Sequence, residues 1–171
     1  MAGGTRSALT DEFWRGYRDA AGLRHDDYDV VAFGDGPEMA TELAELTVAG
    51  IKRATAGLVC QFGPDGEPPP VAGGYVVLLD GADRPRAIWR TTEVRRGPLN
   101  SVDERFAWDE GEGERTREWW LSAHRRFFGH RAAAQGFQMH DEIETMFERF
   151  EIVWPREIAD IGRPSGDATG K

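Results

Sequence analysis

The stretch Gly50-Ile51-Lys52-Arg53-Ala54-Thr55-Ala56-Gly57 follows an amphipathic segment and places one lysine three residues before one threonine. Positions three apart on a helical turn share a face, so we expect Lys52 and Thr55 to converge on one small volume. A lysine that loses part of its solvation there has a lowered pKa and can accept a proton from the threonine hydroxyl. The alternative interpretation is a glycine cap at Gly50 followed by a solvated cation.

The segments on either side of this stretch predict an α+β fold. Capping residues and apolar periodicity predict helices at residues 10–21, 37–49 and 116–134, with a short helix after the capping box Ser101-Val102-Asp103-Glu104. Short β-rich runs predict strands at residues 28–33, 56–62, 75–79, 86–95 and 146–154. Strands and helices do not alternate regularly, which argues against a parallel doubly wound sheet. We expect a flexible leader at 1–9, a single domain at 10–157 and a disordered tail at 158–171.

The composition indicates a protein with one hydrophobic core. The chain has 171 residues, of which 40% are hydrophobic, and this suits one domain without metal or disulfide staples. Its single cysteine, Cys60, leaves no disulfide framework and no cysteine-based zinc site. No apolar segment reaches the ~20 residues that span a bilayer, and the first residues lack the apolar run of a signal peptide. We therefore expect a cytoplasmic protein without a membrane partner.

The charges argue against a protein that coats duplex DNA, because the formal net charge is −9. Arginines cluster at residues 84–96 and acidic residues at 103–118, which could create one basic face or merely a solvated strand. The acidic cluster could also supply oxygen ligands to Mg²⁺ or Mn²⁺. The residues concerned are Asp109, Glu110, Glu112 and Glu114. Because they lack the register of a calcium-binding loop, the sequence predicts no dedicated metal or cofactor.

Several short motifs occur in a recognisable order along the chain. They are Ala32-Phe33-Gly34-Asp35, Gly50-x-Lys52-x-x-Thr55, Leu79-Asp80-Gly81, Thr91-Thr92-Glu93-Val94, Glu110-Gly111-Glu112-Gly113-Glu114 and Phe147-Glu148-Arg149-Phe150. Together they resemble the bacterial ASCH-domain family, which is related in fold to the PUA RNA-binding domains. The resemblance covers roughly residues 12–155. It implies a small, mostly antiparallel PUA-like β-barrel surrounded by helices, with a cleft at the barrel mouth.

The same resemblance implies a catalytic trio. Relatives include a hydrolase of N4-acetylcytidine that uses a lysine, a threonine and a glutamate, and Lys52 and Thr55 match the first two. Glu112 matches the glutamate best, while Glu110 and Glu93 remain alternatives. In such a trio Thr55 is the nucleophile, Lys52 the general base, and the carboxylate orients the lysine or donates a proton.

Other relatives point to RNA as the substrate. Longer bacterial members are reported to cleave RNA, in which case the lysine would hold or protonate phosphate oxygens. Single-stranded RNA stacks its bases on aromatic rings, for which Trp89, Trp119 and Tyr75 are candidates, each with core packing as the alternative. We expect Arg53 at the cleft rim and assign substrate binding to Arg53, Glu93 and Trp89.

Two positions depart from the family pattern. Arg53 and Gly57 stand where a small hydroxyl residue is expected. The sequence thus predicts a site for single-stranded RNA or a modified nucleoside. A ribonuclease-like hydrolase is the first hypothesis, with an N4-acetylcytidine-type amidohydrolase and a non-catalytic RNA-binding module as alternatives.

Overall fold

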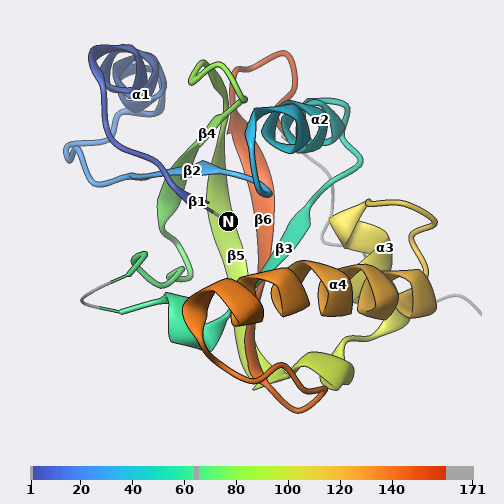
Figure 1. Cartoon of the computed structure of the whole chain (residues 1–171). Helices are drawn as coiled ribbons and strands as arrows, with labels where there is room; N and C mark the ends of the chain where they lie inside the picture. Colours follow the sequence, from blue (N-terminus) through green and yellow to red (C-terminus); the bar gives the residue numbers. More distant parts are fainter. Residues whose placement is uncertain (1, 64–65, 161–171) are drawn as a thin grey trace, which may run out of the picture.

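A computed structural model describes residues 2–63 and 66–160, which form one curled sheet with helices around it (Figure 1). The strands are β1 (Ala2–Gly3), β2 (Asp29–Ala32), β3 (Ala54–Leu58), β4 (Tyr75–Leu79), β5 (Pro85–Pro98) and β6 (Glu144–Trp154). Their order across the sheet is β1-β2-β4-β5-β6-β3, and only the β2–β4 pair is parallel. The sheet curls into a half-barrel, so the expected mostly antiparallel, PUA-like α+β fold is confirmed.

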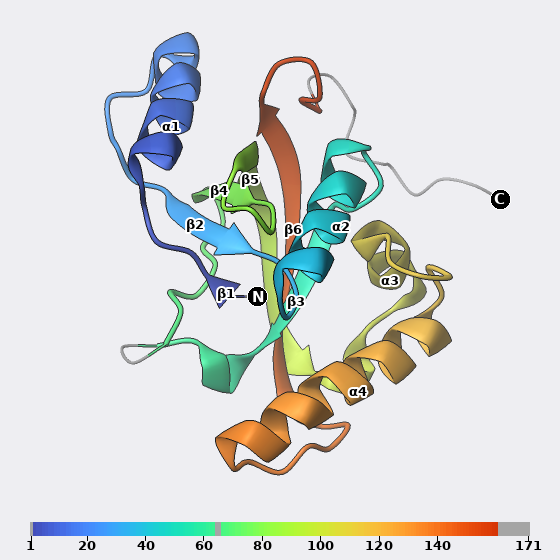
Figure 2. The ribbon, with the colours of Figure 1, turned by 45° about the horizontal axis from the view of Figure 1, so that its top comes forward.

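Helices cover both faces and one end of this sheet. They are α1 (Ala8–Ala21), α2 (Pro37–Val48), α3 (Glu104–Glu110) and α4 (Arg117–Gln135), with short 3₁₀ turns η1 (Val59–Gln61) and η2 (Leu99–Ser101). Figure 2 shows α1 and α4 at opposite ends of the molecule, with the long strands β5 and β6 between them. In the described part of the chain, no helix has the length and apolar character needed to cross a membrane.

Alternation along β6 divides the core between the two faces of the sheet. Phe147 packs with residues of α3 and α4, whereas Phe150 packs with residues of α2 and β5. On the α2 side, Trp89 stacks between Phe33 and Phe150, with ring centroids 5.5 and 4.5 Å away. Phe33 follows β2 directly, so this stack ties β2, β5 and β6 together where the site described below lies.

The two chain ends differ from the sequence-based expectation. In the segment expected to be a leader, Ala2–Gly3 pairs with β2 and α1 begins at Ala8 behind a Ser7 cap. Thr10, expected at the helix start, instead completes the capping box with Ser7. The expected tail also begins too early, since Asp160 accepts a backbone hydrogen bond from Ile152 at 2.8 Å. The rest of that tail, residues 161–171, lies outside the described residues.

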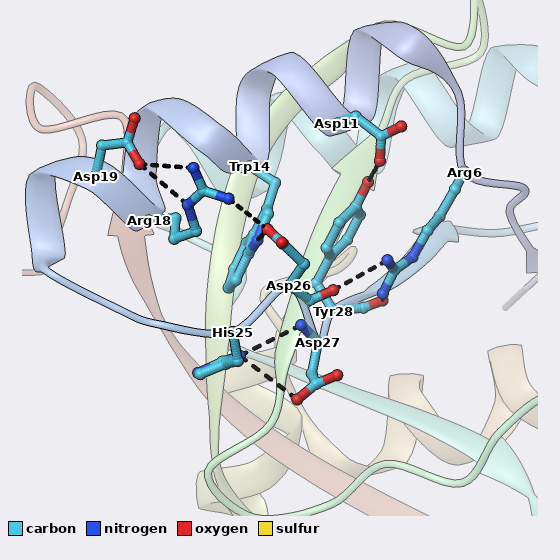
Figure 3. A network of polar contacts seen from close by, with 9 residues as sticks. All are labelled: Arg6, Asp11, Trp14, Arg18, Asp19, His25, Asp26, Asp27 and Tyr28. Atoms are coloured by element: carbon cyan, nitrogen blue, oxygen red, sulfur yellow. Dashed lines mark hydrogen bonds and ion pairs between the residues drawn. The ribbon is translucent and has the colours of Figure 1, made fainter.

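Polar contacts fasten α1 to the loop before β2 (Figure 3). Asp26 accepts hydrogen bonds from Trp14 Nε1 at 3.2 Å and from Arg18 at 2.8 Å. The Tyr28 hydroxyl donates to Asp11 at 2.6 Å, and its ring stacks on Trp14 with centroids 5.0 Å apart. These contacts join the first helix of the chain to the outer face of the sheet.

Candidate functional site

The connection between α2 and β3 positions Lys52 and Thr55. The amides of Ile51 and Lys52 both donate to the carbonyl oxygen of Leu46, at 3.0 and 3.1 Å, which closes the end of α2. Lys52 therefore lies in the connection and Thr55 in β3, so the expectation that they share a helical turn is wrong. Their positions are set by the end of α2 and the start of β3, rather than by helical spacing.

Two carboxylates surround the Lys52 ammonium group. Lys52 Nζ lies 2.5 Å from Glu112 Oε1, and 3.4 Å from both Glu110 Oε1 and the Glu110 carbonyl oxygen. Lys52 has no exposed surface and Glu110 is 2% exposed. The Phe33 ring lies 5.0 Å from Nζ and adds a cation–π contact. Among the described residues Thr55 is not a hydrogen-bond partner of Lys52.

This arrangement keeps the lysine protonated. Burial by itself lowers the pKa of Lys52, but the charges of Glu112 and Glu110 outweigh burial, and the pKa is raised above its ordinary value. Burial by itself raises the pKa of Glu110, but Lys52 and His124 outweigh it and hold that pKa below its usual range. The expected lowered pKa of Lys52 is therefore wrong, because sequence spacing did not show the two facing carboxylates.

Gly111 allows both glutamates to face one lysine. It follows α3 with a φ of 75°, a left-handed conformation that favours glycine. A Cβ at this position would lie 2.6 Å from the carbonyl oxygen of Ile51. A side chain at position 111 would therefore clash with the connection that carries Lys52. This close approach explains why glycine lies between Glu110 and Glu112.

Helix α4 completes the polar cluster. Trp120 Nε1 donates to Glu110 Oε2, and His124 Nε2 lies 3.6 Å from Glu110 Oε1. His124 Nδ1 lies 3.0 Å from the Trp120 carbonyl oxygen. Because a carbonyl oxygen only accepts, we assign a proton to Nδ1. The His124 ring also stacks on Trp120, with centroids 3.7 Å apart, so its orientation is fixed from two sides.

A pocket of about 340 Å³ opens beside this cluster, between α2, β3 and α4. Its inner wall includes Phe33, Thr55, Glu110 and His124, all at most 8% exposed. Its outer wall includes the more exposed residues Met39, Glu112, Trp119, Arg126 and His130. No hydrogen bond within the described residues engages the Thr55 hydroxyl, so it is available to a ligand. The pocket thus gathers Thr55 and both acidic candidates, while Lys52 lies behind its wall.

The three residues assigned to substrate binding lie elsewhere. Arg53 binds Asp160 with Nε–Oδ2 at 2.6 Å and donates to the Thr47 carbonyl oxygen at 2.7 Å, so it is not at the cleft rim. Trp89 is fully buried and donates from Nε1 to Glu148 at 3.0 Å, which leaves no face for a base. Glu93 is exposed beside Arg149 and does not line the pocket.

Acidic residues of the segment 109–114 form ion pairs with basic side chains of the same chain. Asp109 pairs with Arg149, and Glu110 and Glu112 pair with Lys52. Within residues 2–63 and 66–160, no group of three or more His, Cys, Asp or Glu side chains is arranged to hold a metal ion. The metal-ligand interpretation of this loop therefore gains no support from its geometry.

Sequence reasoning missed the contribution of α4 to the pocket. Ala123, Arg126 and His130 line it together with Trp119 and Phe127. Their spacing along the chain is the i, i+4, i+7, i+8, i+11 pattern of one helical face, which is the signal that could have identified them. Of the three aromatic candidates for base stacking, Trp119 is the one that lines this pocket.

Comparisons with known proteins agree with this architecture. A family model for the ASCH domain matches residues 29–154, so the chain belongs to the ASCH-domain family. The fold is similar to the crystal structure of an ASCH domain from Lactobacillus crispatus, at 27% identity and a TM-score of 0.77, covering 86% of this chain and 95% of that one. It is also similar to the crystal structure of a protein from Enterococcus faecalis, at 35% identity and a TM-score of 0.76, covering 85% of this chain and 92% of that one. No curated protein matches the chain.

Proposed function

We propose that the pocket binds an acylated cytidine and hydrolyses its N4-acyl amide, with Thr55 as the nucleophile. The observation that carries this proposal is the inner wall of the pocket, where an unengaged hydroxyl lies in an enclosed, largely apolar site that also contains carboxylates. A volume of about 340 Å³ suits one nucleoside better than a polymer segment. Phe33, Trp119 and Phe127 supply aromatic surface for a base.

The reaction divides into two acyl transfers. Thr55 Oγ1 attacks the acyl carbon, the carbon–N4 bond breaks, and the hydroxyl proton passes through Glu112 to the departing amine. Water then hydrolyses the acyl-threonine ester, which releases the carboxylic acid and restores the hydroxyl. We assign the base role to Glu112 rather than Lys52, because Glu112 lines the pocket whereas Lys52 is buried and protonated. Lys52 is then a positioning residue that orients both carboxylates.

A ribonuclease role receives less support. A phosphodiester in the pocket would meet the carboxylates of Glu110 and Glu112, which repel it. The lysine that would neutralise the phosphate has no exposed surface. A neutral amide meets neither obstacle, and so the geometry favours the amidohydrolase hypothesis over the ribonuclease hypothesis.

The experiment compares Thr55→Ala and Glu112→Gln with the exposed control Thr92→Ala, using N4-acetylcytidine and a single-stranded RNA. We expect Thr55→Ala to reduce acetylcytidine hydrolysis to the uncatalysed rate. Glu112→Gln should lower kcat roughly 10²–10⁴-fold, the usual contribution of a general base. Thr92→Ala should retain the wild-type kcat, because its side chain is exposed on β5 outside the pocket.

Four outcomes would contradict the proposal or its assignment of roles. Full activity of Thr55→Ala would remove the threonine nucleophile. RNA cleavage that Thr55→Ala retains and Lys52→Ala loses would restore the ribonuclease hypothesis. Nucleoside binding without turnover of either substrate would identify a binding module. If the kcat of the wild type rises between about pH 7 and 9 and the kcat of Lys52→Met does not change over that range, Lys52 is the general base.

A further inference from the structure

Charge changes sign between the inner and outer ends of the pocket. Glu110 lies at the inner end and is 2% exposed. Arg126 and His130 lie at the outer end, where both side chains are exposed. A ligand that fills the pocket therefore meets the Glu110 carboxylate and the Thr55 hydroxyl at the inner end and a guanidinium group at the outer end. This polarity fits a ligand with a neutral amide end and an anionic end.

Arg126 differs from the other arginines of α4. Arg117 donates to the carbonyl oxygens of Val102 and Asn100, both at 2.7 Å. The other two form ion pairs, Arg125 with Asp141 at 2.8 Å and Arg131 with Asp35 at 3.3 Å. Across the described ranges 2–63 and 66–160, Arg126 forms no hydrogen bond or ion pair. The one arginine of this helix that lines the pocket thus keeps all its donors available.

The spacing on α4 fits the dimensions of a nucleotide. Arg126 and His130 are four residues apart, so they share a helical face. His124 at the inner end and His130 at the outer end are six residues apart, about 9 Å along the axis at 1.5 Å per residue. A base and its ribose can bridge such a length, which would bring a ribose phosphate to His130 and to the side chain of Arg126, one turn away on the same helical face. Guanidinium binds phosphate with two parallel hydrogen bonds, and His130 can add another donor.

Resting on the proposed function, we propose that the substrate is a nucleoside 5′-monophosphate whose phosphate binds Arg126 and His130. The acylated base then occupies the inner end beside Thr55, and the phosphate stays at the solvent-exposed rim, away from the buried Glu110. A monoester fits better than an RNA strand because the pocket has room for about one nucleotide and, among the described residues that line it, Arg126 is the one arginine or lysine.

The test measures kcat and KM of the wild type on three substrates. These are N4-acetylcytidine, its 5′-monophosphate, and a short single-stranded RNA with one N4-acetylcytidine. We expect a KM at least about tenfold lower for the monophosphate than for the nucleoside, the size of a charge-assisted hydrogen bond, with similar kcat. Arg126→Ala should raise the monophosphate KM to that of the nucleoside. The control Arg125→Ala removes a neighbouring arginine that binds Asp141, and should keep the preference.

Equal KM values for nucleoside and monophosphate in the wild type would overturn the inference. It would also be overturned if Arg125→Ala lost the preference for the monophosphate as fully as Arg126→Ala. A lower KM for the RNA than for the monophosphate would show that the substrate is an RNA strand rather than a phosphate monoester. If no substrate is turned over, the proposed function fails, and calorimetric titration with CMP and cytidine decides the inference separately. Tighter binding of CMP that Arg126→Ala abolishes supports it, and equal binding contradicts it.

Discussion

Glu148 carries a carboxyl group into the interior of the half-barrel. Only 2% of the residue is exposed, and its Oε1 accepts hydrogen bonds from Trp89 Nε1 at 3.0 Å and from Thr91 Oγ1 at 2.6 Å. Burial raises the pKa of Glu148 above its ordinary value, and these two hydrogen bonds offset only part of that effect. Glu148 also pairs in register with Thr55 across β6 and β3, so the two side chains lie on the same face of the sheet.

Replacing Glu148 should change how stability depends on pH. A carboxyl whose pKa is higher in the folded state binds more protons there than in the unfolded chain, so its ionisation destabilises the fold as pH rises above the ordinary value of 4.5. Glu148→Gln keeps the acceptor and removes the ionisation. We expect the variant to be more stable than the wild type at pH 8, by on the order of 1 kcal/mol, and to lose that advantage near pH 4.

Urea unfolding at both pH values measures this difference. The control is Glu151→Gln, a more exposed glutamate on the same strand that pairs with Arg90. Equal pH dependence of Glu148→Gln and the wild type would contradict the assignment of a raised pKa.

Lys52 shows what sequence can and cannot predict about one residue. A motif resemblance predicted it in one site with Thr55 and a glutamate, and the structure places the lysine beside both Glu110 and Glu112, behind the wall of the pocket. Its charge state did not follow, because the partners lie 58 and 60 residues further along the chain. Local spacing describes near neighbours, whereas the pKa depends on all groups within a few ångströms.

Helix α1 lies outside the segment matched by the family model, which begins at residue 29. Its main anchor is Trp14, which is 1% exposed and packs against Tyr28, with an edge contact to Tyr17. Truncating a fully buried aromatic ring removes its transfer free energy and leaves a cavity. We expect Trp14→Ala to lower the free energy of unfolding by about 3–5 kcal/mol.

Chemical denaturation followed by far-ultraviolet circular dichroism measures that loss. The matched control is Trp108→Ala, because Trp108 is 57% exposed and its removal should change stability by about 0.5 kcal/mol or less. If Trp14→Ala costs no more than Trp108→Ala, α1 is not part of the cooperative fold.

Elements were more predictable than the contacts between them. Apolar periodicity and caps are local signals, so residues 37–49 and 116–134 were predicted within a residue or two of α2 and α4. Arg53 was misplaced because its partner, Asp160, is 107 residues away. Trp89 was misplaced because alternation along a strand does not say which face of a curled sheet is covered by a helix.

Over the whole molecule, most of the arginines in the 84–96 segment are neutralised by ion pairs. Arg84 and Arg86 both pair with Asp80, at 2.9 and 3.2 Å. Arg90 pairs with Glu151, and Arg96 with Glu144. Arginines that are adjacent in the sequence thus meet acids contributed by the β4–β5 turn and by β6. The segregation visible along the chain does not persist in the fold.

This distribution predicts weak binding to nucleic-acid duplexes. Non-specific affinity comes from cations that displace the counterions of phosphates, and most arginines of the 84–96 segment are already paired with acids. We expect fluorescence anisotropy with a labelled DNA duplex to give a Kd at or above ~10⁻⁴ M at physiological salt, the weak end of non-specific binding. A micromolar duplex Kd that weakens steeply with salt would contradict this expectation, because only a continuous basic surface produces that salt dependence.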